Sequence, residues 1–166
     1  MTGLTMRSFL PCAPPRRRNA GFSIIEIMIV VVIISLIALL ALPAFNRIRR
    51  AAQTKRFVND VRVFAQAFEG YATMNGSFPP NATSGVVPIG MNSDLRPSVW
   101  RATNSIGGLW NWDNDGMGRA GIVAAQVTAP LSQMVEIDAL IDDGDLTAGL
   151  FQEVIPGTRY IYFMKQ

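Results

Sequence analysis

The feature that most constrains this sequence is an apolar run of 24 residues, 22–45, which contains a single charged side chain, Glu26. As an α-helix that rises about 1.5 Å per residue, the run is long enough to cross a hydrocarbon core of about 30 Å. A secretory signal has a shorter apolar region, and its small-residue cleavage site comes after that region. Here the small residue, Gly21, precedes the run, so cleavage there would keep the helix in the mature chain. We therefore predict a retained membrane-spanning helix.

The position of Glu26 needs a physical reason. A carboxylate at the centre of a bilayer costs about 2.5–3.5 kcal/mol, and less near an end of the span. The helix dipole at the first turn recovers only about 0.3–1 kcal/mol. Cleavage after Gly21 would create a free α-amino group on Phe22, and helices packed with an axial offset would bring Glu26 of one copy to the Phe22 amine of its neighbour. The alternative is a plain anchor whose Glu26 lies near the lipid headgroups.

The charges that flank the apolar run do not decide its orientation. Cations lie at both ends, so the positive-inside rule does not clearly favour either orientation of the helix in the membrane. The cations before the run are Arg16, Arg17 and Arg18, and those after it are Arg47, Arg49, Arg50, Lys55 and Arg56.

Composition excludes several classes of function. The formal charge is +3, but a chain that starts at Phe22 has 11 basic and 12 acidic side chains, so nothing favours a nucleic-acid partner. The sequence has no histidine, which removes the usual general base and the commonest zinc ligand. Its one cysteine, Cys12, precedes Gly21, so the mature chain would have no disulfide. No motif of a catalytic serine is present either. We therefore expect no enzyme.

The string GFSIIEIMIVVVIISLIALLALPAF, at residues 21–45, resembles the N-terminus of type IV pilins and of the pseudopilins of type II secretion. The shared features are a basic leader, a glycine before an aromatic residue, a glutamate as fifth residue of the mature chain, and a proline late in the aliphatic run. The resemblance covers residues 16 to about 50. It implies that a prepilin peptidase cuts between Gly21 and Phe22 and methylates the Phe22 amine. It also implies that Glu26 is needed for assembly and that Pro43 is the kinking proline.

The same resemblance implies where the protein works and with what. The leader would stay in the cytoplasm, and the single-pass chain would lie in a bacterial inner membrane with its C-terminal domain in the periplasm. Its partners would be the lipid bilayer, prepilin peptidase, an inner-membrane assembly platform, copies of itself and other pilin-like subunits. The filament would be a type IV pilus or a pseudopilus for protein transport. The lack of C-terminal cysteines and the acidic D-D-G stretch favour the major pseudopilins but do not decide between the two. The alternative function is a membrane-anchored binding module that does not polymerise.

Beyond the apolar run the helical pattern continues as an amphipathic stripe, so the two halves predict one helix of about 50 residues. Pro43 removes a backbone hydrogen bond and should bend or locally melt that helix. The sequence NGSFPP at 75–80 should end it. The residues of the stripe are Phe45, Ile48, Ala52, Val58, Val61, Phe64, Ala65, Phe68 and Tyr71.

The remainder predicts a small antiparallel sheet laid on this helix, a pilin-like α+β fold. Trp110 and Trp112 alternate as the inward residues of a strand would, and strands are also expected at 120–127, 150–154 and 158–165, the last with apolar residues on both faces. Residues 76–108 should form a long loop with at most a short strand or helical turn. A short helix is indicated by Met134, Ile137, Leu140 and Ile141. The expected domains are a cleaved leader (1–21), a spanning helix (22–45) and a periplasmic or extracellular domain (46–166).

Two acidic segments are candidate calcium sites. Asn111, Asp113 and Asp115 with a following glycine match the first half of a calcium loop, but the glutamate that an EF-hand requires is replaced by Ile122. In the second segment, three carboxylates lie within four residues and repel unless they are solvated or bridged by a cation. That segment resembles the acidic segment of major pseudopilins, some of which hold Ca²⁺. The alternative is a solvated turn. The three carboxylates belong to Asp142, Asp143 and Asp145.

Overall fold

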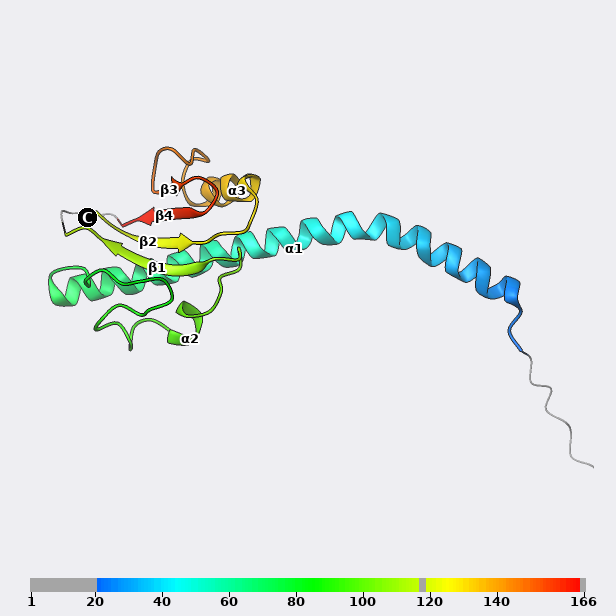
Figure 1. Cartoon of the computed structure of the whole chain (residues 1–166), viewed down its shortest axis with the longest axis horizontal. Helices are drawn as coiled ribbons and strands as arrows, with labels where there is room; N and C mark the ends of the chain where they lie inside the picture. Colours follow the sequence, from blue (N-terminus) through cyan, green and yellow to red (C-terminus); the bar gives the residue numbers. More distant parts are fainter. Residues whose placement is uncertain (1–20, 117–118, 165–166) are drawn as a thin grey trace, which may run out of the picture. The chain divides into compact units, whose positions relative to one another are not determined.

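The computed structural model describes residues 21–116 and 119–164 (Figure 1). The chain divides into two compact units, with the boundary between Leu42 and Pro43. The predicted leader lies almost wholly outside the described residues. The elements in chain order are α1 (Ile24–Asn75), α2 (Pro97–Trp100), β1 (Leu109–Asn114), β2 (Ala120–Ala125), α3 (Leu131–Ile141), β3 (Phe151–Ile155) and β4 (Arg159–Phe163).

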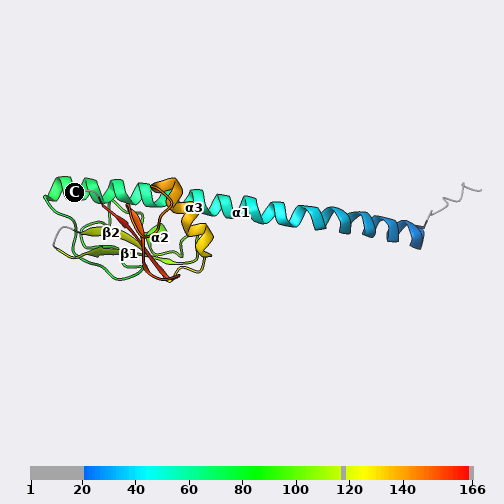
Figure 2. The same cartoon turned by 90° about the horizontal axis from the view of Figure 1, so that it is seen from above.

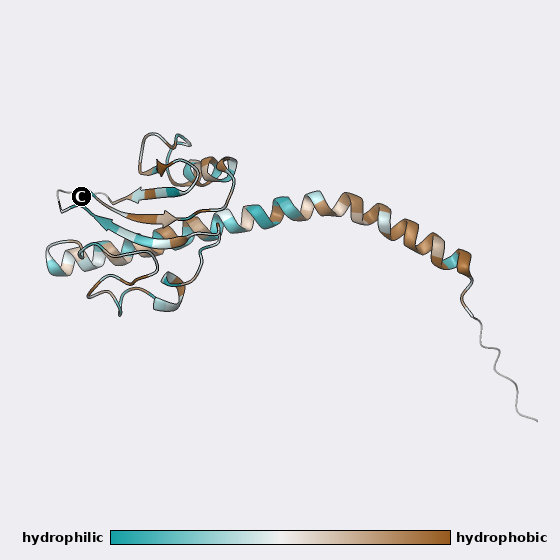
Figure 3. Cartoon of the chain, in the orientation of Figure 1, coloured by the Kyte–Doolittle hydropathy of each residue, from teal (hydrophilic) through white to brown (hydrophobic). Residues whose placement is uncertain are grey.

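The first unit contains the N-terminal part of α1. Every residue from 21 to 42 is exposed, and Figure 3 shows that this part of the helix is almost entirely hydrophobic. Among the described residues, α1 is the one helix long and apolar enough to cross a membrane. Its most apolar stretch is 0% buried, which distinguishes it from the core helix of a soluble protein. The helix runs through Pro43 without interruption, so the predicted local melting does not occur in this structure.

The second unit is a four-stranded antiparallel sheet packed on the C-terminal part of α1. The strand order is β1-β2-β4-β3, and every neighbouring pair is antiparallel. Figure 2 shows this part of α1 lying along one face of the sheet. The predicted pilin-like α+β arrangement is therefore confirmed.

Aromatic side chains of α1 and β1 form the centre of the core. The Phe57 and Trp110 rings stack with centroids 5.0 Å apart, and those of Phe68 and Trp112 stack at 3.7 Å. Phe64 meets the edge of Trp110 at 5.1 Å. Such rings dominate core energetics because each buries about 150–250 Å². Trp110 and Trp112 are at most 1% exposed, so their predicted inward alternation is confirmed.

The loop after α1 is held to this core by tryptophan side chains. α1 ends at Asn75 as predicted, and Gly76 follows with φ +76°, a left-handed conformation that glycine adopts at no steric cost. The indole N–H of Trp112 donates to the Pro79 carbonyl at 3.0 Å. Trp100, at the end of α2, donates to the Val86 carbonyl at 2.8 Å. The loop is long, as predicted, and α2 is its short helical turn.

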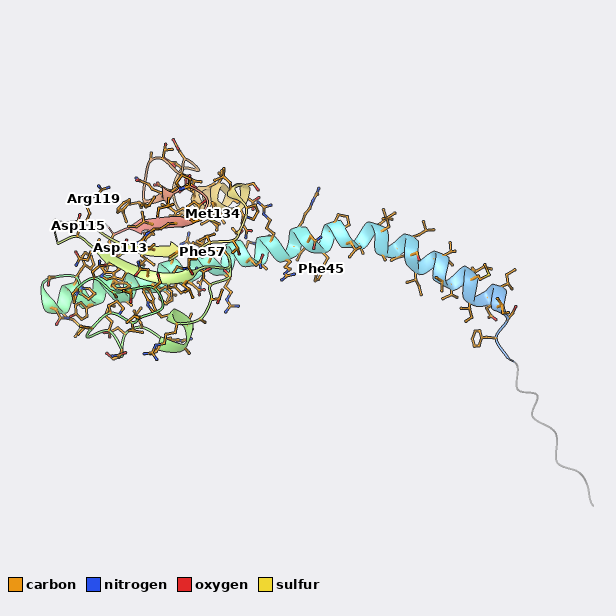
Figure 4. All side chains as sticks on the ribbon, in the orientation of Figure 1. Phe45, Phe57, Asp113, Asp115, Arg119 and Met134 are labelled. Carbon is orange, nitrogen blue, oxygen red and sulfur yellow. The ribbon has the colours of Figure 1, made fainter. Side chains whose placement is uncertain are left out.

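The predicted amphipathic stripe begins before the buried face of α1 does. Phe45 and Ile48 are 63% and 69% exposed, and Ala52 is exposed as well. The buried face of α1 begins at Thr54, because the sheet packs only on the part of the helix that follows (Figure 4). The prediction also missed Phe57, which is 1% exposed and stacks on Trp110.

The other predicted elements are present with shorter bounds. β2, β3 and β4 lie at 120–125, 151–155 and 159–163, and α3 covers the short helical pattern. On β4, Tyr160 faces the main core, while Ile161 joins a second cluster with Val123 and Ala125. Phe163, at the edge of that cluster, is half-buried, and the Arg119 guanidinium lies 5.0 Å from its ring centroid. The prediction that β4 has apolar residues on both faces is therefore confirmed, although the face away from the main core carries only a small cluster.

Candidate processing and assembly site

The predicted cleavage position lies immediately before the first turn of α1. The Ser23 carbonyl accepts hydrogen bonds from the backbone N–H groups of Glu26 and Ile27, at 3.1 and 3.3 Å, and so begins the helix. Gly21 and Phe22 precede it outside regular structure, and Phe22 is 77% exposed. A side chain built on Gly21 would meet nothing within 4 Å. The Gly21–Phe22 peptide bond is thus open to an enzyme that must approach it closely.

Glu26 lies in the first turn of α1 with its side chain exposed. The described residues form two ion pairs, Arg50 with Glu136 and Asp113 with Arg159, and neither involves Glu26. The surrounding surface of the helix is apolar and includes a shallow groove. That groove is lined by Ile25, Met28, Ile29, Val32 and Ile33. Both the pairing of Glu26 with a neighbour's Phe22 amine and the alternative of a Glu26 near the lipid headgroups stay predictions.

Residues 16–42 match the family model of the prokaryotic N-terminal methylation motif. This motif is the cleavage signal of prepilins, the precursors of type IV pilins and pseudopilins. The chain carries a prepilin signal. The match contains the predicted cleavage bond and Glu26, and it ends before Pro43. Neither the curated proteins nor the solved structures that were searched contain a match to the chain.

The first candidate calcium segment covers the C-terminal half of β1 and the start of the turn that follows, far from the prepilin signal in sequence. Asp113 forms an ion pair with Arg159 and accepts a hydrogen bond from the Asn111 amide at 2.9 Å. Asp115 accepts a hydrogen bond from the backbone N–H of Arg119 at 3.0 Å, which closes the turn between β1 and β2. Figure 4 shows Asp113, Asp115 and Arg119 at the same end of the sheet. These contacts give the acidic groups structural partners.

The second segment forms the turn that follows α3. Asp143 accepts a hydrogen bond from the backbone N–H of Asp145 at 2.9 Å, and Asp142 accepts one from that of Leu150. Asp145 accepts hydrogen bonds from the Thr147 hydroxyl and backbone N–H, at 2.7 and 3.0 Å, and these bonds lower the pKa of Asp145. Asp and Gly residues supply such local bonds in ordinary turns.

Within the described ranges, no three His, Cys, Asp or Glu side chains are grouped so that they could hold a metal ion. Binding of Ca²⁺ at Asn111, Asp113 and Asp115, or at Asp142, Asp143 and Asp145, therefore stays an untested prediction. The hydrogen bonds favour the alternative of a solvated turn for the second segment.

The sequence prediction missed Asp138, an acidic residue inside the fold. Asp138 is 0% exposed, and neither of its carboxylate oxygens has a hydrogen-bond partner. Burial, followed by the charges of Asp143 and Asp142, raises its pKa to about 6, and the nearby backbone N–H of Gly144 partly opposes the rise. Its position offered a signal, because it lies one helical turn after the core residue Met134.

Proposed function

We propose that this chain is a structural subunit of a type IV pilus-like or type II secretion pseudopilus filament. Prepilin peptidase would cut between Gly21 and Phe22 and methylate the Phe22 amine, and an inner-membrane assembly platform would add the mature chain to a filament. Residues 22–45 would lie in the bilayer before assembly and in the filament core afterwards. Residues 46–166 would form the domain on the periplasmic or extracellular side, and the leader (1–21) would be left in the cytoplasm.

One observation supports this proposal most strongly. The prepilin signal leads directly into a helix whose residues 24–42 are all exposed, with a carboxylate in its first turn. A helix of this kind is stable in lipid, and outside lipid only when other apolar helices cover it. Assembly with copies of the same chain would provide that cover, and a neighbour's amine would neutralise Glu26.

N-terminal sequencing of the membrane fraction tests the processing step. In cells with prepilin peptidase we expect a mature start at methylated Phe22, and in cells without it an intact leader. An intact Met1 in both strains, or a cut after residue 45, would contradict the proposal. Fibres sheared or purified from the same cells should contain the Phe22-started chain. A correctly processed chain that never enters fibres would instead support the membrane-anchored binding module.

A further inference from the structure

The charges of the second unit are segregated along the chain. Residues 46–59 of α1 contain five cations and no acid, whereas residues 120–158 contain six acids and no cation. We call the first the basic stretch and the second the acidic segment. The cations are Arg47, Arg49, Arg50, Lys55 and Arg56, and the acids are Glu136, Asp138, Asp142, Asp143, Asp145 and Glu153.

Few of these charges neutralise one another within one copy. Of the two ion pairs among the described residues, one joins the basic stretch to the acidic segment, between Arg50 and Glu136 at 3.3 Å. Arg47, Arg49 and Lys55 are exposed on α1 and take part in neither pair. A run of cations beside a membrane span is also unfavourable on the side to which the chain is translocated. The basic stretch therefore presents positive charge that ion pairs within its own copy do not neutralise.

The turn after α3 is the complementary surface. Asp142, Asp143 and Asp145 are exposed there, and the described structure gives none of them an ion pair. Directly behind them, buried Asp138 has two carboxylate oxygens without a hydrogen-bond partner, which adds to the negative potential of this surface. Arg62, whose guanidinium donates to the Leu140 carbonyl at 3.2 Å, supplies one positive charge nearby, fewer than the three carboxylates of the turn. The turn thus presents unbalanced negative charge to solvent.

The contacts of α3 place its two ends at different levels of α1. Arg50 contacts Ser132 near the start of α3 and Glu136 at its middle, and Arg62 contacts Leu140 near its end. Twelve helical residues span about 18 Å. The acidic turn follows Leu140 and lies toward the level of Arg62, whereas Arg47 and Arg49 of the basic stretch lie beside the level of Arg50. A neighbour displaced along the helix axis by on the order of 15 Å would align its basic stretch with this turn.

We propose that the basic stretch of one copy docks on the acidic turn, Asp142 to Asp145, of a second copy. This contact rests on the proposed filament function and adds an electrostatic connection between the folded domains. Complementary charges give register and suppress wrong pairings, because like charges in contact repel strongly. The partner is thus a second copy of this chain, displaced along the filament axis.

Charge reversal with rescue tests the contact in the full-length chain. The variants Asp143→Lys/Asp145→Lys and Arg47→Glu/Arg49→Glu should each lower the amount of purified fibre by at least about tenfold, because each places like charges opposite one another. The quadruple variant restores opposite charges and should recover most of the fibre. The matched control Glu69→Lys/Asp94→Lys reverses two exposed acids outside the acidic segment and should leave fibre yield within about twofold.

A cross-linking measurement covers the case in which the lysine variants fail to fold. A chain that starts at Phe22 contains no cysteine, so introduced cysteines form only the intended bonds. Cells that produce both an Arg49→Cys chain and an Asp143→Cys chain should yield an oxidised dimer that contains one of each. An Arg101→Cys chain in place of the Arg49→Cys chain should not yield it.

Three outcomes would overturn this contact without affecting the proposed function. The first is normal fibre yield in both charge-reversed variants. The second is a loss in both that the quadruple variant does not restore. The third is a loss only in Arg47→Glu/Arg49→Glu, which would assign the basic stretch to anionic lipid headgroups. If the unaltered chain is not processed at Phe22, or never enters fibres, the proposed function itself fails.

Discussion

The two parts of α1 use apolar residues in opposite ways. From residue 24 to 42, all side chains apart from Glu26 and Ser35 are apolar and all are exposed, so no described part of the same chain covers this part of the helix. From Thr54 to Phe68 the buried residues lie on one face and meet the sheet of the same chain. The comparison shows that hydrophobicity around the whole circumference indicates an intermolecular role, whereas hydrophobicity on one face indicates a core. Between them, Phe45, the last residue of the apolar run, and Ile48, which follows it, are exposed like the first part.

The largest effect should come from removing the one charge of the first part. The variant Glu26→Ala should abolish fibres while processing at Phe22 and membrane insertion continue, because the amine of the neighbour loses its counter-charge. Glu69→Ala, which removes an exposed glutamate from the second part of the same helix, should assemble normally. Quantification of fibres and of the membrane-bound pool separates assembly from insertion. Fibres of normal length and amount from the Glu26→Ala chain would contradict the proposed role.

The second part should respond in stability rather than in assembly. Phe57 is 1% exposed and stacks on Trp110, so Phe57→Ala should destabilise the folded domain by about 3–5 kcal/mol. Phe45→Ala changes a residue that is 63% exposed and should cost less than about 0.5 kcal/mol. Thermal unfolding of the full-length chain in detergent measures both. Equal losses would show that the sheet also covers the helix around residue 45.

A smaller effect should come from Asp138, a charge inside the second part. Because the pKa of Asp138 is raised from 3.8 to about 6 in the folded chain, the folded state binds its proton more tightly than the unfolded state does. Stability from this group is therefore present below pH 4 and is lost as pH rises through about 6. Asp138→Asn should remove that dependence and stabilise the chain by about 1–3 kcal/mol at pH 7, with little change at pH 4.

The control for this prediction is Asp94→Asn, which neutralises an exposed acid and should leave the pH profile unchanged. Unfolding followed by circular dichroism at several pH values between 4 and 8 gives both profiles. A profile of Asp138→Asn that still declines between pH 4 and 6 would show that other carboxyl groups cause the decline.

The smallest expected effect is that of calcium. Because the carboxylates of the turn after α3 accept hydrogen bonds from that turn, we expect Ca²⁺ or a chelator to shift the melting temperature by less than about 2 °C. A binding ion would raise it in proportion to the logarithm of its concentration. A rise of more than about 5 °C that Asp143→Asn abolishes would establish a calcium site.

The sequence predicted what depends on local pattern. Helix length, the break at Asn75 and the inward alternation of Trp110 and Trp112 follow from periodicity and turn residues, and all are present. The start of the buried stripe depends on where the sheet ends, a tertiary property, so Phe45 and Ile48 were wrongly included and Phe57 was missed. The ion pair of Asp113 joins residues 46 positions apart, and spacing alone could not reveal it.

The loop between α1 and β1 is fastened at a few points. The indole N–H groups of Trp112 and Trp100 donate to Pro79 and Val86, and between and beyond these points the chain includes exposed residues such as Ile89 and Asn92. The exposed positions of the loop are therefore free to change, whereas Met91 and Leu95, which are 0% and 2% exposed, belong to the core. Chains that share this scaffold are therefore expected to differ most at positions such as Ile89 and Asn92, where a changed side chain alters the surface and leaves the core beneath it intact.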